Sequence, residues 1–151
     1  MPELGPSQKP LVSFRYPHMM PEDAAVWSRF LMREDHGIEA VWYDVHVGAA
    51  VDVPEGSPAW LLSVAAGVTR KRIDVVARRG GLYLIIEVKP YANQLALGQV
   101  IVYRQLFPVE FPLAGPVMGC IVCDQVDVDV GPIAGDLNVV VFSNEYVPKQ
   151  S

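Results

Sequence analysis

The chain has 151 residues, of which 51% are hydrophobic and 19% are charged, and its formal net charge is −5 at pH 7. This length and this apolar share favour one domain with a sizeable core. The acidic balance argues against binding nucleic acid mainly through charge, because neutralising phosphates takes an excess of Lys and Arg. No run approaches the roughly 18 apolar residues that a membrane helix needs, and Met1–Pro10 lacks the apolar core of a signal peptide. We therefore expect a cytoplasmic protein with no membrane partner.

The start of the chain reads as an arm followed by a helix. Residues 1–20 contain four prolines and little periodicity, so we expect an irregular arm over 1–20, one folded domain over 21–143 and a tail over 144–151. Pro21-Glu22-Asp23 has the composition of a helix start. Apolar residues at helical spacing extend the predicted helix to about Glu34, before Gly37.

The next segment, Glu39–Val47, alternates as a strand does. One predicted face carries Val41, Tyr43, Val45 and Val47, and the other carries Trp42, Asp44 and His46. Asp44 and His46 could approach a metal together, although a half-exposed strand face explains them equally well. In Gly48–Gly67, which joins this strand to the next, Ser57-Pro58 can cap a short helical turn.

Two strand-like runs, Ile73–Ala77 and Leu82–Val88, flank a Gly80-Gly81 turn and predict a β-hairpin. Glu87 and Lys89 are two residues apart, so both point to the same face of their strand. The hairpin would bring Asp74 close to Glu87. A buried pair of carboxylates is costly unless a cation lies between them, and Mg²⁺ prefers such oxygen ligands.

A helix, a loop and two more strands are predicted after Pro90. Asn93–Phe107 has helical composition, and Gln99 and Tyr103 are four residues apart on one face of that helix. Val117–Val122 is a continuous apolar run that predicts a buried strand, and Val139–Phe142 predicts a last short strand. Between these two strands lies a polar stretch that we expect to face solvent, with Asp124, Asp127 and Asp129.

The ordered set of Asp74, Glu87-Val88-Lys89 and the Gln99/Tyr103 pair resembles the PD-(D/E)XK nuclease superfamily. The Gln-x-x-x-Tyr pair is most similar to the RecB-like branch of that superfamily. The resemblance implies a restriction-endonuclease-like α-β-β-β-α-β core in the α/β class, with a small mixed sheet flanked by helices. The element order from periodicity agrees with this core. The chain departs from the family pattern at Ile73, where Pro conventionally precedes the first acid.

The resemblance implies a Mg²⁺- or Mn²⁺-dependent deoxyribonuclease that hydrolyses phosphodiester bonds. Asp74, Glu87 and the backbone carbonyl of Val88 would bind the metal, and Lys89 would position or activate the attacking water. Gln99 and Tyr103 would contact the DNA backbone or orient Lys89. The family's N-terminal helix can add a ligand, for which Glu34 is the first candidate and Glu22 the second.

Five of the twelve basic residues flank the Asp74 strand and could contact DNA phosphates or lie in solvent: Arg70, Lys71, Arg72, Arg78 and Arg79. The DNA could be single- or double-stranded, and cutting both strands would favour a homodimer. Two alternatives remain open. One is a catalytically silent protein of the same fold, serving as a nucleic-acid-binding or assembly component of a phage or mobile element. The other is an ordinary ion pair between Glu87 and Lys89.

Overall fold

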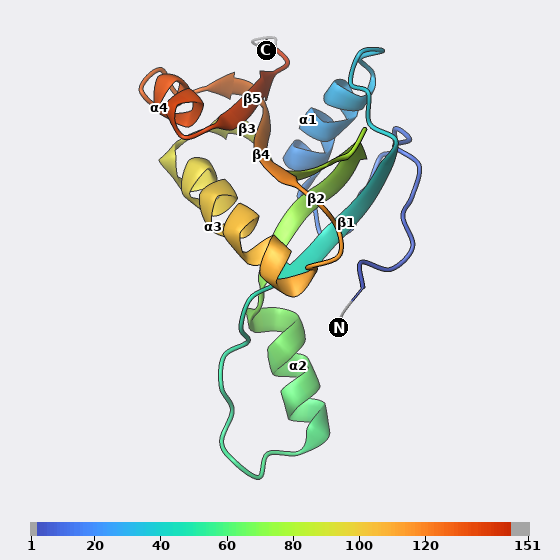
Figure 1. The fold of residues 1–151 in the computed structure, drawn as a ribbon, viewed down its shortest axis with the longest axis vertical. Coiled ribbons are helices and arrows are strands. Elements are labelled where there is room, and N and C mark those ends of the chain that lie inside the picture. Colours follow the sequence, from blue (N-terminus) through green and yellow to red (C-terminus); the bar gives the residue numbers. More distant parts are fainter. Residues whose placement is uncertain (1–2, 146–151) are drawn as a thin grey trace.

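The computed structural model describes residues 3–145, without the side chains of 66–69, so the predicted tail lies outside the described residues from 146 onwards. The described residues form, in chain order, α1 (Pro21–Leu31), β1 (Ala40–Val47), α2 (Ala59–Thr69), β2 (Lys71–Arg79), β3 (Leu82–Ala92), α3 (Gln94–Glu110), β4 (Val117–Val126), α4 (Val130–Asp136) and β5 (Val139–Ser143). The strands form one sheet in the order β1-β2-β3-β4-β5 (Figure 1). The predicted α/β class, with a small mixed sheet flanked by helices, is confirmed.

The sheet changes direction at its centre. β1, β2 and β3 are antiparallel neighbours, whereas β3, β4 and β5 run parallel. The β2–β3 hairpin turns where the sequence predicts it, and Gly80 has a φ of 60°, which glycine adopts without a Cβ penalty. Parallel neighbours require a crossover connection, and α3 and α4 provide the two that the sheet needs.

Helices cover both faces of the sheet. α1 packs over β3 and β4, and its buried residues Trp27 and Phe30 contact sheet residues such as Val75 and Ile86. α3 lies on the opposite face, where Val100 and Phe107 are buried against the strands. The hairpin strands therefore lie between two helices that approach from opposite sides.

The predicted alternation of β1 is wrong beyond Tyr43. Val41 and Tyr43 pack on the α1 side, but Val45 and Val47 pack on the α3 side. The cause is Asp44, whose φ of 53° lies in the left-handed region and reverses the side to which the following residues point. The register with β2 also has no paired contact for Asp44.

Several predicted helix bounds also change. α1 ends at Leu31 instead of about Glu34, and the short turn expected after Ser57-Pro58 is the eleven-residue helix α2. α3 runs on past Phe107 to Glu110, and it begins where the Asn93 side chain accepts hydrogen bonds from the first turn. α4 was not predicted at all.

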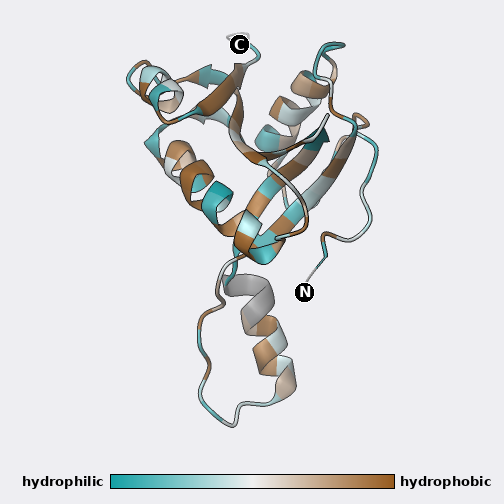
Figure 2. Cartoon of the chain, viewed as in Figure 1, coloured by the Kyte–Doolittle hydropathy of each residue, from teal (hydrophilic) through white to brown (hydrophobic). Residues whose placement is uncertain are grey.

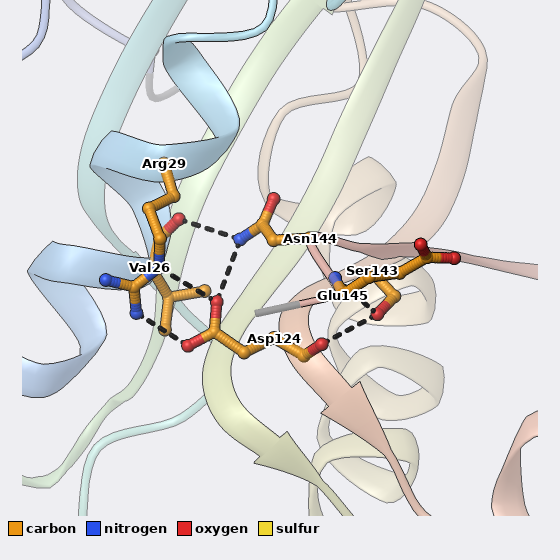
Figure 3. Close-up of polar contacts among 6 residues, drawn as sticks. All are labelled: Val26, Arg29, Asp124, Ser143, Asn144 and Glu145. Atoms are coloured by element: carbon orange, nitrogen blue, oxygen red, sulfur yellow. Dashed lines mark hydrogen bonds and ion pairs between the residues drawn. The ribbon is translucent and has the colours of Figure 1, made fainter. Parts of the chain in front are cut away.

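Asp124 does not face solvent as predicted. It lies within β4, its exposed fraction is 5%, and its carboxylate accepts two hydrogen bonds from Arg29 of α1 at 3.0 and 2.6 Å. Asn144 donates to the same carboxylate and to the Val26 carbonyl, and the Ser143 hydroxyl donates to the Asp124 carbonyl (Figure 3). This network ties α1 to the ends of β4 and β5.

The segment before α1 is irregular, as expected. Residues 3–20 contain an isolated bridge between Gln8 and Val41 but no helix or full strand. Tyr16 is nevertheless buried, and its hydroxyl hydrogen-bonds Ser28 of α1 at 2.7 Å. Among the described helices, none has the length and apolar content to cross a membrane.

Close contact between α3 and β4 depends on Gly119. A Cβ at this position would lie 2.6 Å from Cγ1 of the buried Val100 and 3.3 Å from Cδ of Arg104. Both neighbours belong to α3, the helix that carries Gln99 and Tyr103. A larger residue at 119 would therefore push α3 away from the sheet.

We expect Gly119→Ala to lower the free energy of unfolding by about 1–3 kcal/mol, because the added methyl group overpacks the α3–β4 contact. Gly81→Ala is the matched control: its Cβ would meet nothing within 4 Å, and its backbone φ is not in the left-handed region. Urea denaturation of both variants measures the difference. Equal stability of the two variants would contradict the close contact.

Candidate functional site

The hairpin places the Asp74 carboxyl beside the Glu87 carboxyl. The β2–β3 ladder ends at the pair Val75–Ile86, so Asp74 and Glu87 are the first opposite residues beyond it. The backbone N–H of Val88 donates to Oδ2 of Asp74 at 2.9 Å. The two strands therefore separate where the acids lie, and Asp74 satisfies an amide that the β2–β3 ladder leaves free.

Glu87 is the most constrained acid of this site. Its exposed fraction is 2%, and its Oε1 is buried with no hydrogen-bond partner among the described residues. Burial raises the pKa of Glu87 well above its ordinary value, and the charge of Asp74 and a hydrogen bond to Asp74 raise it further. In the absence of a cation, burial and the neighbouring carboxyl thus favour the neutral form of Glu87.

Asp74 has a similar but milder balance. Burial raises its pKa, while the Val88 N–H, the hydrogen bond with Glu87 and the charge of Lys89 act in the opposite direction. Lys89 lies two residues beyond Glu87 on β3 and acts electrostatically on both acids. The structure thus brings together the two carboxylates and the amine that the sequence predicts as neighbours.

α3 adds Gln99 and Tyr103 to the same place. Tyr103 is buried, and burial followed by the charge of Glu87 raises the pKa of its hydroxyl. That hydroxyl is hydrogen-bonded to Gln99, whose own Oε1 is buried without a partner among the described residues. Two of the three such orphaned side-chain atoms thus belong to Glu87 and Gln99, which both interact with Tyr103.

The residues at this site fit a hard divalent cation. Mg²⁺ and Mn²⁺ take oxygen ligands, and Mg²⁺ is usually held by one or two carboxylates with water completing the shell. Asp74 and Glu87 supply two carboxylates, and no described residue hydrogen-bonds the Glu87 Oε1. No described group of three or more His, Cys, Asp or Glu side chains is arranged to hold a metal. Further ligands would therefore be backbone oxygens or water.

The acid of α1 that interacts electrostatically with this site is Asp23. Burial raises the pKa of Asp23, the charge of Lys89 lowers it, and the charges of Asp74 and Glu22 raise it. Glu22 is exposed, and Glu34 is exposed beyond the C-terminal end of α1, whose last residue lies about 12 Å along the helix axis from Asp23. No sequence pattern separates Asp23 from Glu22, because both are acids in the first turn of the helix.

A second charged cluster lies on the β1 side of Asp74. Oδ2 of Asp44 lies 3.3 Å from Nε2 of His18 and 3.4 Å from Nε2 of His46, and Oδ1 lies 3.7 Å from Nη1 of Arg72. The charge of Asp44 also contributes to the raised pKa of Asp74. Asp44 and His46 therefore pair with each other, beside the two acids.

Four of the five basic residues predicted to contact DNA make contacts within the chain. Arg70 pairs with Glu110, Arg72 with Asp44 and Arg78 with Glu39, while Arg79 lies over the Phe142 ring. Lys71 is exposed. Arg70 directly precedes β2, Lys71 and Arg72 begin it and Arg78 and Arg79 end it, so the set is divided between the two ends of one strand.

Glu87→Gln should change how stability depends on pH. Because the pKa of Glu87 is raised in the folded state, its contribution to stability is full below the ordinary value of 4.5 and is lost as pH rises through the raised pKa. We expect the variant, in metal-free buffer, to lose less stability than wild type over this rise. Denaturation at a series of pH values measures it, with the exposed Glu55→Gln as control. Parallel curves for wild type and Glu87→Gln would contradict the assignment.

Comparison with known proteins adds little to this geometry. No family model matches the chain, and no curated protein matches it. A solved crystal structure of a protein of unknown function, AF1548, is similar at 20% sequence identity and a TM-score of 0.44. The match covers 82% of this chain and 58% of AF1548, so this chain spans less than two thirds of the length of AF1548.

Proposed function

We propose that this chain is a metal-dependent nuclease of the PD-(D/E)XK type that hydrolyses DNA phosphodiester bonds. One observation carries the proposal: the buried and unpartnered Glu87 Oε1 lies beside the Asp74 carboxyl, where the hairpin strands separate. Two like charges buried together need a proton or a cation between them. An oxygen-rich site of this kind suits a hard divalent metal.

The arrangement of elements supports the finer fold assignment. α1 precedes three antiparallel strands, α3 crosses over from β3 to β4, and β4 joins the sheet parallel to β3. With α2 as an insertion, this is the α-β-β-β-α-β order of a restriction-endonuclease-like core. The order places the Asp74 strand and the Glu87–Lys89 strand at the middle of the sheet.

The chain's own residues have distinct roles in this proposal. Asp74, Glu87 and the Val88 carbonyl would hold Mg²⁺ or Mn²⁺, which supplies positive charge against the phosphate and makes a nearby water more acidic. Lys89 would orient the attacking water or a phosphate oxygen. Tyr103 and Gln99 would fix the position of the Glu87 side chain and exclude water from its buried side.

A catalytically silent role in nucleic-acid binding is the second candidate. The observation that favours it is the engagement of Arg70, Arg72 and Arg78 in ion pairs within an acidic chain, which leaves few cations for a long DNA groove. It differs from the nuclease in one measurable way. It predicts DNA binding without cleavage under any metal.

We expect the purified chain to cleave DNA when Mg²⁺ or Mn²⁺ is added, and we expect cleavage to stop when the metal is chelated. Asp74→Asn, Glu87→Gln and Lys89→Ala should each lower the rate by about 100-fold or more, because each removes a metal ligand or the group that orients water. Asp129→Asn, which changes an exposed acid directly before α4, is the control. Single-stranded, double-stranded and branched DNA should all be tried. Cleavage that survives all three substitutions would show that the activity lies elsewhere.

Asp23 and Glu34 form a matched pair for locating the contribution of α1. Asp23→Asn should weaken Mn²⁺ binding by roughly 10-fold, the size typical of groups just outside the ligand shell, whereas Glu34→Gln should leave it unchanged. Isothermal titration calorimetry measures both without requiring cleavage. A larger effect of Glu34→Gln would restore Glu34 as the acid that serves the metal.

A further inference from the structure

Residues 48–69 project from the body of the protein. We call this segment the arm from here on; it is distinct from the irregular N-terminal segment over 1–20. The arm consists of an extended loop followed by α2, and it extends away from the sheet and from the helices that cover it (Figure 1). Among the contacts described, α2 packs extensively against no other helix or strand. The arm returns to the body at Arg70, which is paired with Glu110 at the end of α3.

α2 is apolar but exposed. Its sequence, AWLLSVAAGVT, contains no charged residue. Trp60, Leu62 and Val64 have exposed fractions of 67%, 52% and 50%. Figure 2 shows hydrophobic residues along the described part of this helix, outside the body of the protein. A helix that is hydrophobic around its circumference is normally buried, so this one requires a partner surface.

The chemistry of the arm favours a protein partner over a membrane or a nucleic acid. At about 1.5 Å per residue, the 11 residues of α2 reach about 16 Å, roughly half of a bilayer core. The arm carries two acids, Asp52 and Glu55, and no Lys, Arg or His. Anionic lipids and nucleic acids attract basic segments, so neither would draw in this arm.

The body of the protein has an apolar pocket near the base of the arm. The pocket has a volume of about 490 Å³ and is lined by Leu4, Trp42, Tyr83, Phe111, Leu113 and Ala114, together with Glu3 and Pro112. Phe111 directly follows Glu110, the residue that pairs with Arg70. Leu113 on its rim has an exposed fraction of 84%. We call this the Trp42–Phe111 pocket.

We propose that two copies of this chain form a twofold-symmetric dimer in which Trp60 of each arm occupies the Trp42–Phe111 pocket of the other copy. Trp60 is the second residue of α2, at the end away from Arg70, whereas Phe111 of the pocket directly follows Glu110, the partner of Arg70 at the base of the arm. Two arms side by side in opposite directions would therefore bring each Trp60 to the partner's pocket. An uncharged helix matches an apolar pocket, and an isologous contact is the commonest way for a chain to bind itself.

The available area agrees with a stable dimer. Trp60, Leu62 and Val64 together expose on the order of 350 Å² of apolar surface, of which the indole supplies about half. Two arms and the two surfaces that they cover would bury roughly 1,400 Å², within the range of about 1,200–2,000 Å² for specific interfaces. Arms paired only with each other would bury about half as much, which is why the pocket is part of the proposal.

This inference stands apart from the proposed nuclease activity, since assembly can be measured without metal or DNA. The two are linked by the chain, because Arg70 at the base of the arm is four residues before Asp74. A dimer built on the arms would therefore hold two Asp74–Glu87 sites at a fixed separation. A dimer without nuclease activity would contradict only the proposed function, and an active monomer would contradict only the proposed dimer.

Sedimentation velocity over a range of concentrations tests the dimer. Wild type should be dimeric, and Trp60→Glu should raise the dimer dissociation constant by roughly 30-fold or more, as loss of a central aromatic contact does. Val128→Glu changes an even more exposed apolar residue outside the arm and the pocket, and it should leave the dimer intact. A monomeric wild type, or a Trp60→Glu dimer as stable as wild type, would overturn the proposal.

Mixing two variants tests the pocket itself. Trp60→Lys and Leu113→Glu should each be monomeric alone, but their mixture should form heterodimers. One of its two contacts then has a native arm in a native pocket, and the other sets Lys against Glu. If Leu113→Glu stays dimeric, or if mixing restores nothing, the arm binds elsewhere. Co-sedimentation of monomeric wild type with phosphatidylglycerol vesicles, lost in Trp60→Glu, would assign the arm to lipid and overturn the dimer.

Discussion

The structure depends on two carboxyl groups that are buried side by side at the point where β2 and β3 separate. Burial is the largest cause of the raised pKa of both, and the charge of Asp74 raises the pKa of Glu87 further. Such a pair is stable when it shares a proton or when a cation replaces that proton. A protein that keeps Glu87 at 2% exposure with one oxygen unpartnered therefore maintains an unfavourable arrangement, and an unfavourable arrangement at one place is typical of a functional site.

The surrounding backbone is shaped to permit this arrangement. The β2–β3 ladder ends one residue before the acids, and the β1–β2 register has no paired contact at Asp44, which lies opposite Asp74. Asp44 has a left-handed backbone, and its carboxylate is surrounded by His18, His46 and Arg72. Both interruptions flank Asp74. β2 therefore lacks regular pairing on both sides at the residue whose carboxyl accepts a hydrogen bond from β3.

Local sequence patterns predict the elements that follow local rules. Residues close together in the sequence determine three such features, and the structure contains all of them: the Gly80-Gly81 turn, the two strands that flank it and the helix face with Gln99 and Tyr103. The face reversal at Asp44 was missed because alternating valines continue on both sides of it. Asp124 was missed because its partner, Arg29, is 95 residues away in sequence. The predicted turn after Ser57-Pro58 is shorter than α2, because a helix that is apolar on all sides has no alternation of polar and apolar residues at helical spacing.

The ion pair between Arg70 and Glu110 connects the projecting arm to the candidate site. Arg70 joins α2 to β2, the strand of Asp74, and Glu110 ends α3, the helix that places Tyr103 against Glu87. The base of the arm is therefore attached to the strand of Asp74 and to the helix of Tyr103. At Asp74 itself, β2 and β3 are joined by the hydrogen bond from the Val88 N–H to Oδ2 of Asp74 in place of a ladder pair. The arm and the site are thus connected through the chain at Arg70 and through the Arg70–Glu110 ion pair.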